Sequence, residues 1–160
     1  MRTIIYLAHP VRHADPAIRR LNFLRAITFG RLLAREGYAP FVPGASVGMV
    51  VEGYPVHQEP FGDPTPMEIC LTHLRSVYDS DGKMEVLLPD AGPMTEGCVI
   101  EVNAWIRWHV EDGYKAQVIT PVRWVALGER MKAHGLEEVW TALRSPADLP
   151  RAAKVLGVCC

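Results

Sequence analysis

The feature that most constrains the fold is an alternation of short apolar runs with segments of helical periodicity. The first run, TIIYLAH at residues 3–9, is continuous and rich in β-branched and aromatic residues. Such a run is typical of a strand buried on both faces of a parallel sheet. A helix follows, because Asp15 and Pro16 form an N-cap signal and apolar residues then recur at helical spacing until Gly37. Strand, loop and crossover helix form the basic unit of α/β folds.

The same alternation continues along the chain. We expect further strands at residues 38–43, 84–89 and 116–120, and helices at residues 67–78, 97–110, 125–133, 136–143 and 149–156. The pattern predicts an α/β fold with a doubly wound, flavodoxin- or Rossmann-like parallel sheet of four to five strands and C-terminal helices. We expect one domain over residues 1–160, with its core at about residues 1–120.

Residues 43–66 interrupt the alternation. The segment is punctuated by glycine and proline but still carries apolar residues such as Val50, Tyr54 and Phe61. A connection of this length in a compact domain is usually functional or disordered. Its apolar content favours a packed lid over a free linker.

Charge and composition exclude several classes of partner. The 160 residues carry a formal net charge of -1, which leaves no broad basic face for a nucleic acid polymer or an anionic membrane and favours a small-molecule ligand. No apolar run is long enough for a membrane span and no signal segment opens the chain, so a cytoplasmic protein is expected. The four cysteines form no CxxC pair, so we expect reduced thiols and no metal site. The terminal Cys159-Cys160 pair is read as a frayed end, with a prenylation tail as the alternative.

Two loops carry polar residues where an α/β sheet binds ligands, beyond the carboxyl ends of its strands. His9 and Arg12 follow the first strand, and residues 90–97 follow the third. The second loop leads into a helix whose free amides favour an anion such as phosphate. Thr95 stands where its hydroxyl caps that helix or contacts the ligand.

Gly97 and Glu101 lie four residues apart and therefore share one face of this helix. Helical side chains lean toward the N-terminus, so we expect Glu101 to point into the crevice over the gap that Gly97 leaves. A partly desolvated carboxylate there can act as a nucleophile or stabilise a developing cation. The alternatives are an ion pair with Arg12 or Arg107, or simple solvation.

The segments IYLAHPVR at residues 5–12 and TEGCVIE at residues 95–101 resemble two motifs of the nucleoside 2-deoxyribosyltransferase-like superfamily. That superfamily includes deoxynucleoside 5'-monophosphate N-glycosidases and uncharacterised phage and bacterial members. Its first strand ends in a tyrosine followed by small residues, and a Ser/Asp-x-Gly-x-x-x-Glu helix start follows the third strand. The resemblance covers about residues 1–120.

The resemblance implies roles for individual residues. Glu101 would be the nucleophile that attacks the anomeric carbon of a ribose or 2-deoxyribose, and Tyr6 would position it. Arg12 would bind a 5'-phosphate. Thr95 stands where the family has serine, a phosphate donor, or aspartate, a sugar ligand, so its hydroxyl favours a nucleotide over a nucleoside. No metal or organic cofactor is implied.

The chain also departs from the family pattern. His9-Pro10 replaces the small Gly-Ser loop usual after the first strand. The family uses an aspartate near the preceding helix to protonate the leaving base, and the nearest candidates here, Asp79 and Asp81, are not in register. Alternative proton donors are His57, Asp63 and His73.

We therefore predict an enzyme that cleaves the N-glycosidic bond of a (deoxy)nucleoside 5'-monophosphate or nucleoside, by hydrolysis or base transfer. Two alternatives remain: a non-catalytic nucleotide-binding or sensor module, and an NAD-type glycohydrolase. The tryptophans also suggest a homo-oligomer, with core packing as the alternative. They are Trp105, Trp108, Trp124 and Trp140.

Overall fold

The protein contains a four-stranded, all-parallel sheet in the computed structural model, which describes residues 1–11, 13–44, 65–113 and 119–157. The strands are β1 (Ile4–Ala8), β2 (Ala39–Phe41), β3 (Lys83–Leu88) and β4 (Thr120–Arg123), in the order β2-β1-β3-β4. The helices are α1 (Pro16–Arg35), α3 (Thr65–Asp79), α4 (Glu96–Glu111), α5 (Gly128–Ala133), α6 (Glu137–Ala142) and α7 (Leu149–Leu156), with short 3-10 helices at Trp124–Leu127 and Pro146–Asp148.

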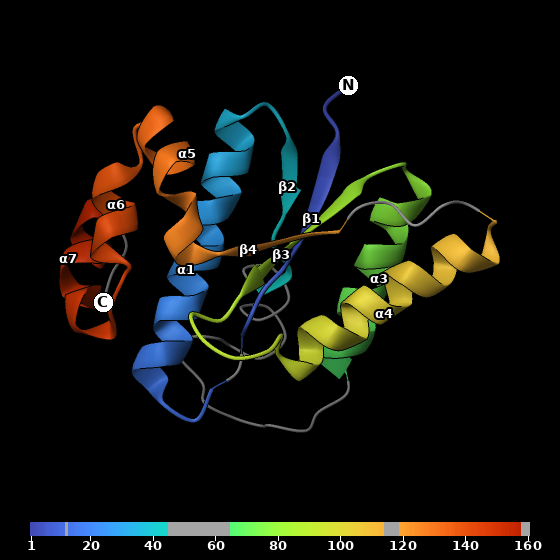
Figure 1. Ribbon diagram of the computed structural model, residues 1–160, viewed down its shortest axis with the longest axis horizontal. Helices are drawn as coiled ribbons and strands as arrows, with labels where there is room; N and C mark the ends of the chain where they lie inside the picture. Colours follow the sequence, from blue (N-terminus) through green and yellow to red (C-terminus); the bar gives the residue numbers. More distant parts are fainter. Residues whose placement is uncertain (12, 45–64, 114–118, 158–160) are drawn as a thin grey trace.

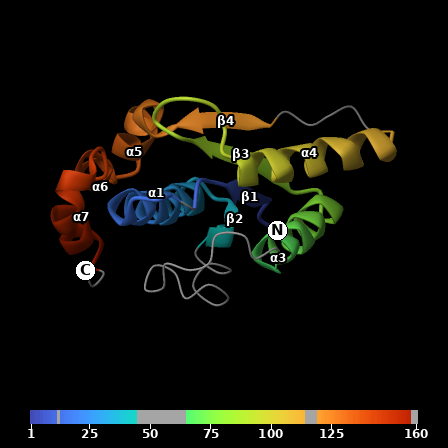
Figure 2. The same cartoon turned by 90° about the horizontal axis from the view of Figure 1, so that it is seen from below.

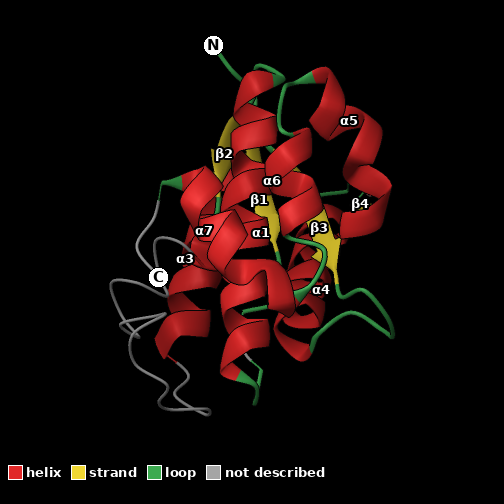
Figure 3. Cartoon of the chain, turned by 90° about the vertical axis from the view of Figure 1, so that its left-hand side faces the viewer, coloured by secondary structure: helices red, strands yellow, loops and turns green. Residues whose placement is uncertain are grey.

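Helices cover both faces of this sheet, which confirms the doubly wound α/β architecture (Figures 1 and 2). Helices α3 and α4 lie on one face, whereas α1 lies on the other. The C-terminal helices α5, α6 and α7 pack outside α1 (Figure 3). Each face therefore has its own apolar cluster.

The central strand β1 shows why its sequence is continuously apolar. Ile5 and Leu7 pack into the cluster on the α1 face, whereas Tyr6 and Ala8 pack into the cluster on the α3 and α4 face. Successive side chains of a strand point to opposite faces, so both sets must be apolar when both faces are covered.

Helix α1 begins and ends close to the predicted positions. The Asp15 carboxylate accepts a hydrogen bond from the Ala17 amide at 2.8 Å, and Pro16 occupies the first turn. Gly37 follows the helix with a φ of 94°, a conformation that side chains with a Cβ disfavour.

Of the predicted fourth strand, residues 116–120, the structure describes only residues 119 and 120 and places Thr120 in a strand. Strand β4 lies at Thr120–Arg123, paired with β3 in a register that sets Thr120 opposite Glu85. Residues 114–118 lie outside the described part of the chain. β4 is an edge strand, which tolerates Pro121 because only one side of it must donate hydrogen bonds.

The C-terminal segment folds into helices near the predicted ranges. The expected helix at residues 125–133 divides into a 3-10 turn and α5, and α7 spans residues 149–156 as predicted. Trp124 and Trp140 exchange hydrogen bonds, with each indole N–H donating to the backbone carbonyl of the other, at 3.2 and 2.9 Å.

Two predictions fall on residues that the structure does not describe. The expected lid at residues 43–66 lies mostly within residues 45–64, and Cys159-Cys160 lies beyond residue 157. Among the described helices, none has the length and apolar content that crossing a membrane requires.

Candidate active site

The candidate site lies between the sheet and α4, beside β1 and β3, which are neighbours at the centre of the sheet. The chain leaves β1 toward α1 on one face and leaves β3 toward α4 on the other. Diverging connections of this kind create the ligand crevice of doubly wound folds.

Tyr6 and Glu101 meet on the face of the sheet that α3 and α4 cover. The Tyr6 hydroxyl, from β1, donates a hydrogen bond to Glu101 Oε1, from the second turn of α4, at 2.6 Å. The Tyr6 side chain is fully buried and Glu101 is 5 % exposed. A phenol and a carboxyl group from segments far apart in sequence therefore form one buried polar pair.

Burial makes both groups of this pair hold their protons more tightly. Loss of solvation raises the pKa of Glu101 to about 7, although the hydrogen bond from Tyr6 acts in the opposite direction. Burial, and then the nearby Glu101 carboxylate, raise the pKa of Tyr6 well above its usual value. Tyr6 thus remains a donor, while Glu101 changes charge near neutral pH.

Gly97 lies near Glu101, at the start of α4. A Cβ built on Gly97 would lie 3.3 Å from the terminal methyl group of Met67, in α3. The missing side chain therefore allows the first turn of α4 to pack against α3. The space that Gly97 leaves is therefore bordered by Met67.

Thr95 occupies the N-cap position of α4, in an extended conformation and without a side-chain capping bond to the helix. A hydrogen bond from Thr95 favours the ionised form of the Cys98 thiol, but burial dominates and raises the pKa of Cys98 to about 12. Cys98 is therefore a protonated, buried thiol and a poor nucleophile. The start of α4 retains amide donors suited to an anion.

His9 is a structural residue, which corrects its prediction as a ligand-binding side chain. Its ring is 4 % exposed. The Gly44 amide donates to Nε2 at 3.1 Å, so Nδ1 carries the proton and donates to the Pro10 carbonyl at 3.0 Å. Burial lowers the pKa of His9 to about 4. The ring joins the end of β1 to Gly44, where an added Cβ would collide with it.

Asp79 and Asp81 do not belong to the site, which corrects their prediction as proton donors. Both precede β3 and so lie at the amino ends of the strands. Their neighbour Tyr78 donates to Asp112 at 2.7 Å, and Asp112 lies about 16 Å beyond Glu101 along α4. Asp79 instead pairs with Arg75 at 2.9 Å.

Asp81 adopts a left-handed conformation, with a φ of 56°, in the turn that leads into β3. The proposed donors Asp63 and His57, and the phosphate ligand Arg12, lie outside the described residues. His73 is exposed on α3 and is separated from Tyr6 by the Phe41 ring, with ring centroids 4.7 Å and 5.7 Å from Phe41 respectively.

Two arginines that the sequence analysis did not identify hold the loop between β3 and α4. Arg25 donates to Asp90 at 2.9 Å, and Arg123 donates to the carbonyls of Pro89 and Gly92, the latter at 3.1 Å. Arg25 falls on the buried face of α1, among apolar residues. A basic residue at such a position is a signal that can be recognised in the sequence.

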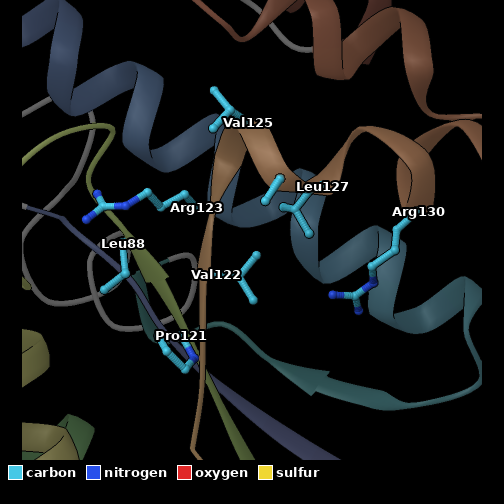
Figure 4. A pocket seen from close by; sticks show the side chains of 8 residues that line it. Leu88, Pro121, Val122, Arg123, Val125, Leu127 and Arg130 are labelled. Carbon is cyan, nitrogen blue, oxygen red and sulfur yellow. The ribbon is translucent and has the colours of Figure 1, made fainter.

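A separate pocket of about 520 Å³ lies beside β4 (Figure 4). Its walls are Leu88, Pro121, Val122, Arg123, Val125, Ala126, Leu127 and Arg130. Neither Tyr6 nor Glu101 contributes to it, so it is distinct from the site of the buried pair. In the described part of the chain, no group of three or more His, Cys, Asp or Glu side chains is arranged to hold a metal ion.

The fold and the buried pair define a doubly wound α/β protein with a buried tyrosine–glutamate pair between β1 and α4. No family model matches the chain, and no curated protein or solved structure matches it significantly.

Proposed function

We propose that this protein cleaves the N-glycosidic bond of a (deoxy)nucleoside 5'-monophosphate or nucleoside, with Glu101 as nucleophile, as a member of the nucleoside 2-deoxyribosyltransferase-like superfamily. The observation that carries the proposal is the buried hydrogen bond between Tyr6 and Glu101. The two residues come from the two motifs that resemble the superfamily, and they form one buried pair between β1 and α4.

The chemistry follows from a carboxylate held beside a sugar. Glu101 attacks the anomeric carbon, and the electrons of the C–N bond leave with the base, which takes up a proton. Water or a second base then attacks the same carbon, which breaks the glycosyl ester and frees the carboxylate. Because Tyr6 donates to Oε1, Oε2 is the oxygen available for attack.

Burial of Glu101 assists this reaction. The carboxylate loses solvation in the folded protein, and within the described part of the chain no cation is among the groups that shift its pKa. A positive charge develops on the sugar as the glycosidic bond breaks. The carboxylate therefore stabilises the transition state more strongly than a neutral ground state.

A 5'-phosphate fits the start of α4. Thr95 makes no side-chain capping bond to this helix, and the amide donors and positive dipole end of the first turn favour an anion. These features support a nucleotide substrate over a nucleoside.

The test is release of free base from a panel of ribo- and deoxyribonucleoside 5'-monophosphates and the matched nucleosides, followed by chromatography. We expect release from at least one monophosphate, and a fall of at least about 10³-fold in Glu101→Gln, with the circular dichroism spectrum unchanged. Glu85→Gln is the matched control, because burial also raises the pKa of Glu85 but its side chain faces Arg130.

Each alternative has its own outcome in this assay. Nucleotide binding without base release would contradict the proposal and indicate a non-catalytic module. Release of nicotinamide from NAD would indicate an NAD-type glycohydrolase. Turnover that persists in Glu101→Gln would exclude Glu101 as the nucleophile.

A further inference from the structure

The exposed large apolar side chains of the described residues gather on one helix. Seven such residues are more than a third exposed, and four of them lie on α4: Val99, Ile100, Ile106 and Val110, at 39, 40, 39 and 69 %. Scattered single apolar residues are normal on a protein surface, whereas a cluster of them on one element indicates an interaction surface.

These four residues occupy the face of α4 that points away from the sheet. The opposite face buries Cys98, Glu101 and Trp105. Positions 99, 103, 106 and 110 follow the spacing of four, three and four residues that forms a continuous helical stripe, with Asn103 at its middle. The helix has 16 residues and is therefore about 24 Å long. It lies at the margin of its layer beside α3 (Figure 2).

The charges at the two ends of this stripe are complementary to each other. Glu96 is exposed at the first position of α4 and forms no ion pair with the residues that the structure describes. Arg107, near the other end, has one long pair with Glu111 at 3.8 Å, and both side chains are more than half exposed. Two antiparallel copies of α4 would bring each Glu96 to within about one turn of the other copy's Arg107.

We infer that this face of α4 is an interface between two copies of the chain, packed antiparallel about a two-fold axis near Asn103. An isologous contact requires a surface that is complementary to itself. The stripe meets that requirement, because Ile100 of one copy then lies opposite Ile106 of the other on each side of Asn103, and its acidic end faces its basic end. This interface does not depend on the proposed function.

The tryptophans themselves do not form the surface for a homo-oligomer. Trp105 and Trp124 are 1 % and 0 % exposed and so belong to the core. Trp108 and Trp140 are half-buried, with Trp108 packed against Tyr78 and Trp140 bonded to Trp124. A contact centred on one helix is small for a dimer interface, so we expect dissociation in the micromolar range.

Sedimentation velocity at protein concentrations from about 1 to about 200 µM tests the interface. We expect the wild type to change from monomer to dimer across this range. Val99→Asp should remain monomeric, whereas Val155→Asp should dimerise like the wild type. The two valines are a matched pair, since each is 39 % exposed and Val155 lies on α7.

Charge reversal is the second test and does not alter the apolar stripe. Glu96→Arg and Arg107→Glu should each weaken the dimer by about tenfold, and the double variant should recover most of the loss. A wild type that stays monomeric at every concentration would overturn the inference. A dimer that Val99→Asp leaves intact would overturn it too, because the contact would then lie elsewhere.

Discussion

Glu101 and Glu85 show how much the surroundings of one residue type matter. Burial raises the pKa of both carboxyl groups. Arg130 opposes this rise at Glu85, from 3.7 Å, whereas among the described residues the neutral hydroxyl of Tyr6 is the group that opposes it at Glu101. A positive charge that develops beside Glu101 is therefore stabilised more strongly than one beside Glu85.

Tyr6→Phe tests this assignment through the pH dependence of kcat/KM. A nucleophilic carboxylate acts when ionised, so the wild-type rate should rise with pH through a pKa of about 7. The Tyr6 hydrogen bond lowers that pKa, so its removal should move the rise to higher pH. We also expect kcat to fall by about 10- to 100-fold.

Tyr78→Phe is the control for this experiment. Tyr78 donates to Asp112 at the opposite edge of the sheet, so its loss should leave the pH profile in place. An unshifted profile in Tyr6→Phe would show that the hydrogen bond does not influence the group that titrates.

At the scale of elements, the C-terminal helices are linked to the site through Arg25. Its guanidinium group donates to the carbonyls of Leu143 and Arg144, which follow α6, and also to Asp90 in the loop before α4. Burial lowers the pKa of Arg25, and Asp90 opposes that effect. The segment beyond residue 120 therefore helps to hold the loop that leads into the helix carrying Glu101.

Asp90→Ala should destabilise the fold by about 1–3 kcal/mol, because it leaves the buried Arg25 cation without its carboxylate. Urea unfolding measures the loss. Asp112→Ala, which removes an exposed partner of Tyr78, should cost less than about 1 kcal/mol. Equal losses in the two variants would contradict a special role for the link between Arg25 and Asp90.

At the scale of the whole molecule, two buried groups titrate with opposite effects on stability. The pKa of Glu101 is raised from 4.5 to about 7, so its folded form holds a proton that the unfolded chain releases. The stability that Glu101 contributes to the folded state is fully present below pH 4.5 and is lost as the pH rises through 7. The pKa of His9 is lowered from 6.5 to about 4, so its contribution is full above pH 6.5 and is lost as the pH falls through 4.

Between about pH 4.5 and 6.5 the two changes in the free energy of unfolding should cancel in the wild type. They have opposite signs, and each amounts to about 3 kcal/mol. Glu101→Gln should therefore gain stability as the pH rises from 4 to 6.5, and should exceed the wild type by about 3 kcal/mol at pH 8. His9→Gln should lose stability from pH 4.5 to 7. Urea unfolding across this pH range measures both profiles, and a Glu101→Gln profile parallel to the wild type would contradict the raised pKa.

The order and type of most elements were predictable from the sequence, whereas the expectation that Tyr6 positions Glu101 came from the family resemblance. Strand β1, helix α1 and helix α7 carry their own signals, because burial on two faces, an N-cap and helical spacing are local patterns. The helical spacing of Gly97 and Glu101 likewise predicted that Glu101 lies on the inward face of α4.

Only the tertiary structure decided the rest, because it depends on contacts between distant segments. The register with β3 set the position of β4, and the direction of α3 carried Asp79 and Asp81 away from the site. Burial of the His9 ring against Gly44 gave it a structural role in place of the predicted ligand contact, and desolvation gave Glu101 its pKa. Sequence spacing encodes which face a side chain takes, whereas packing determines how much water and which partners it meets there.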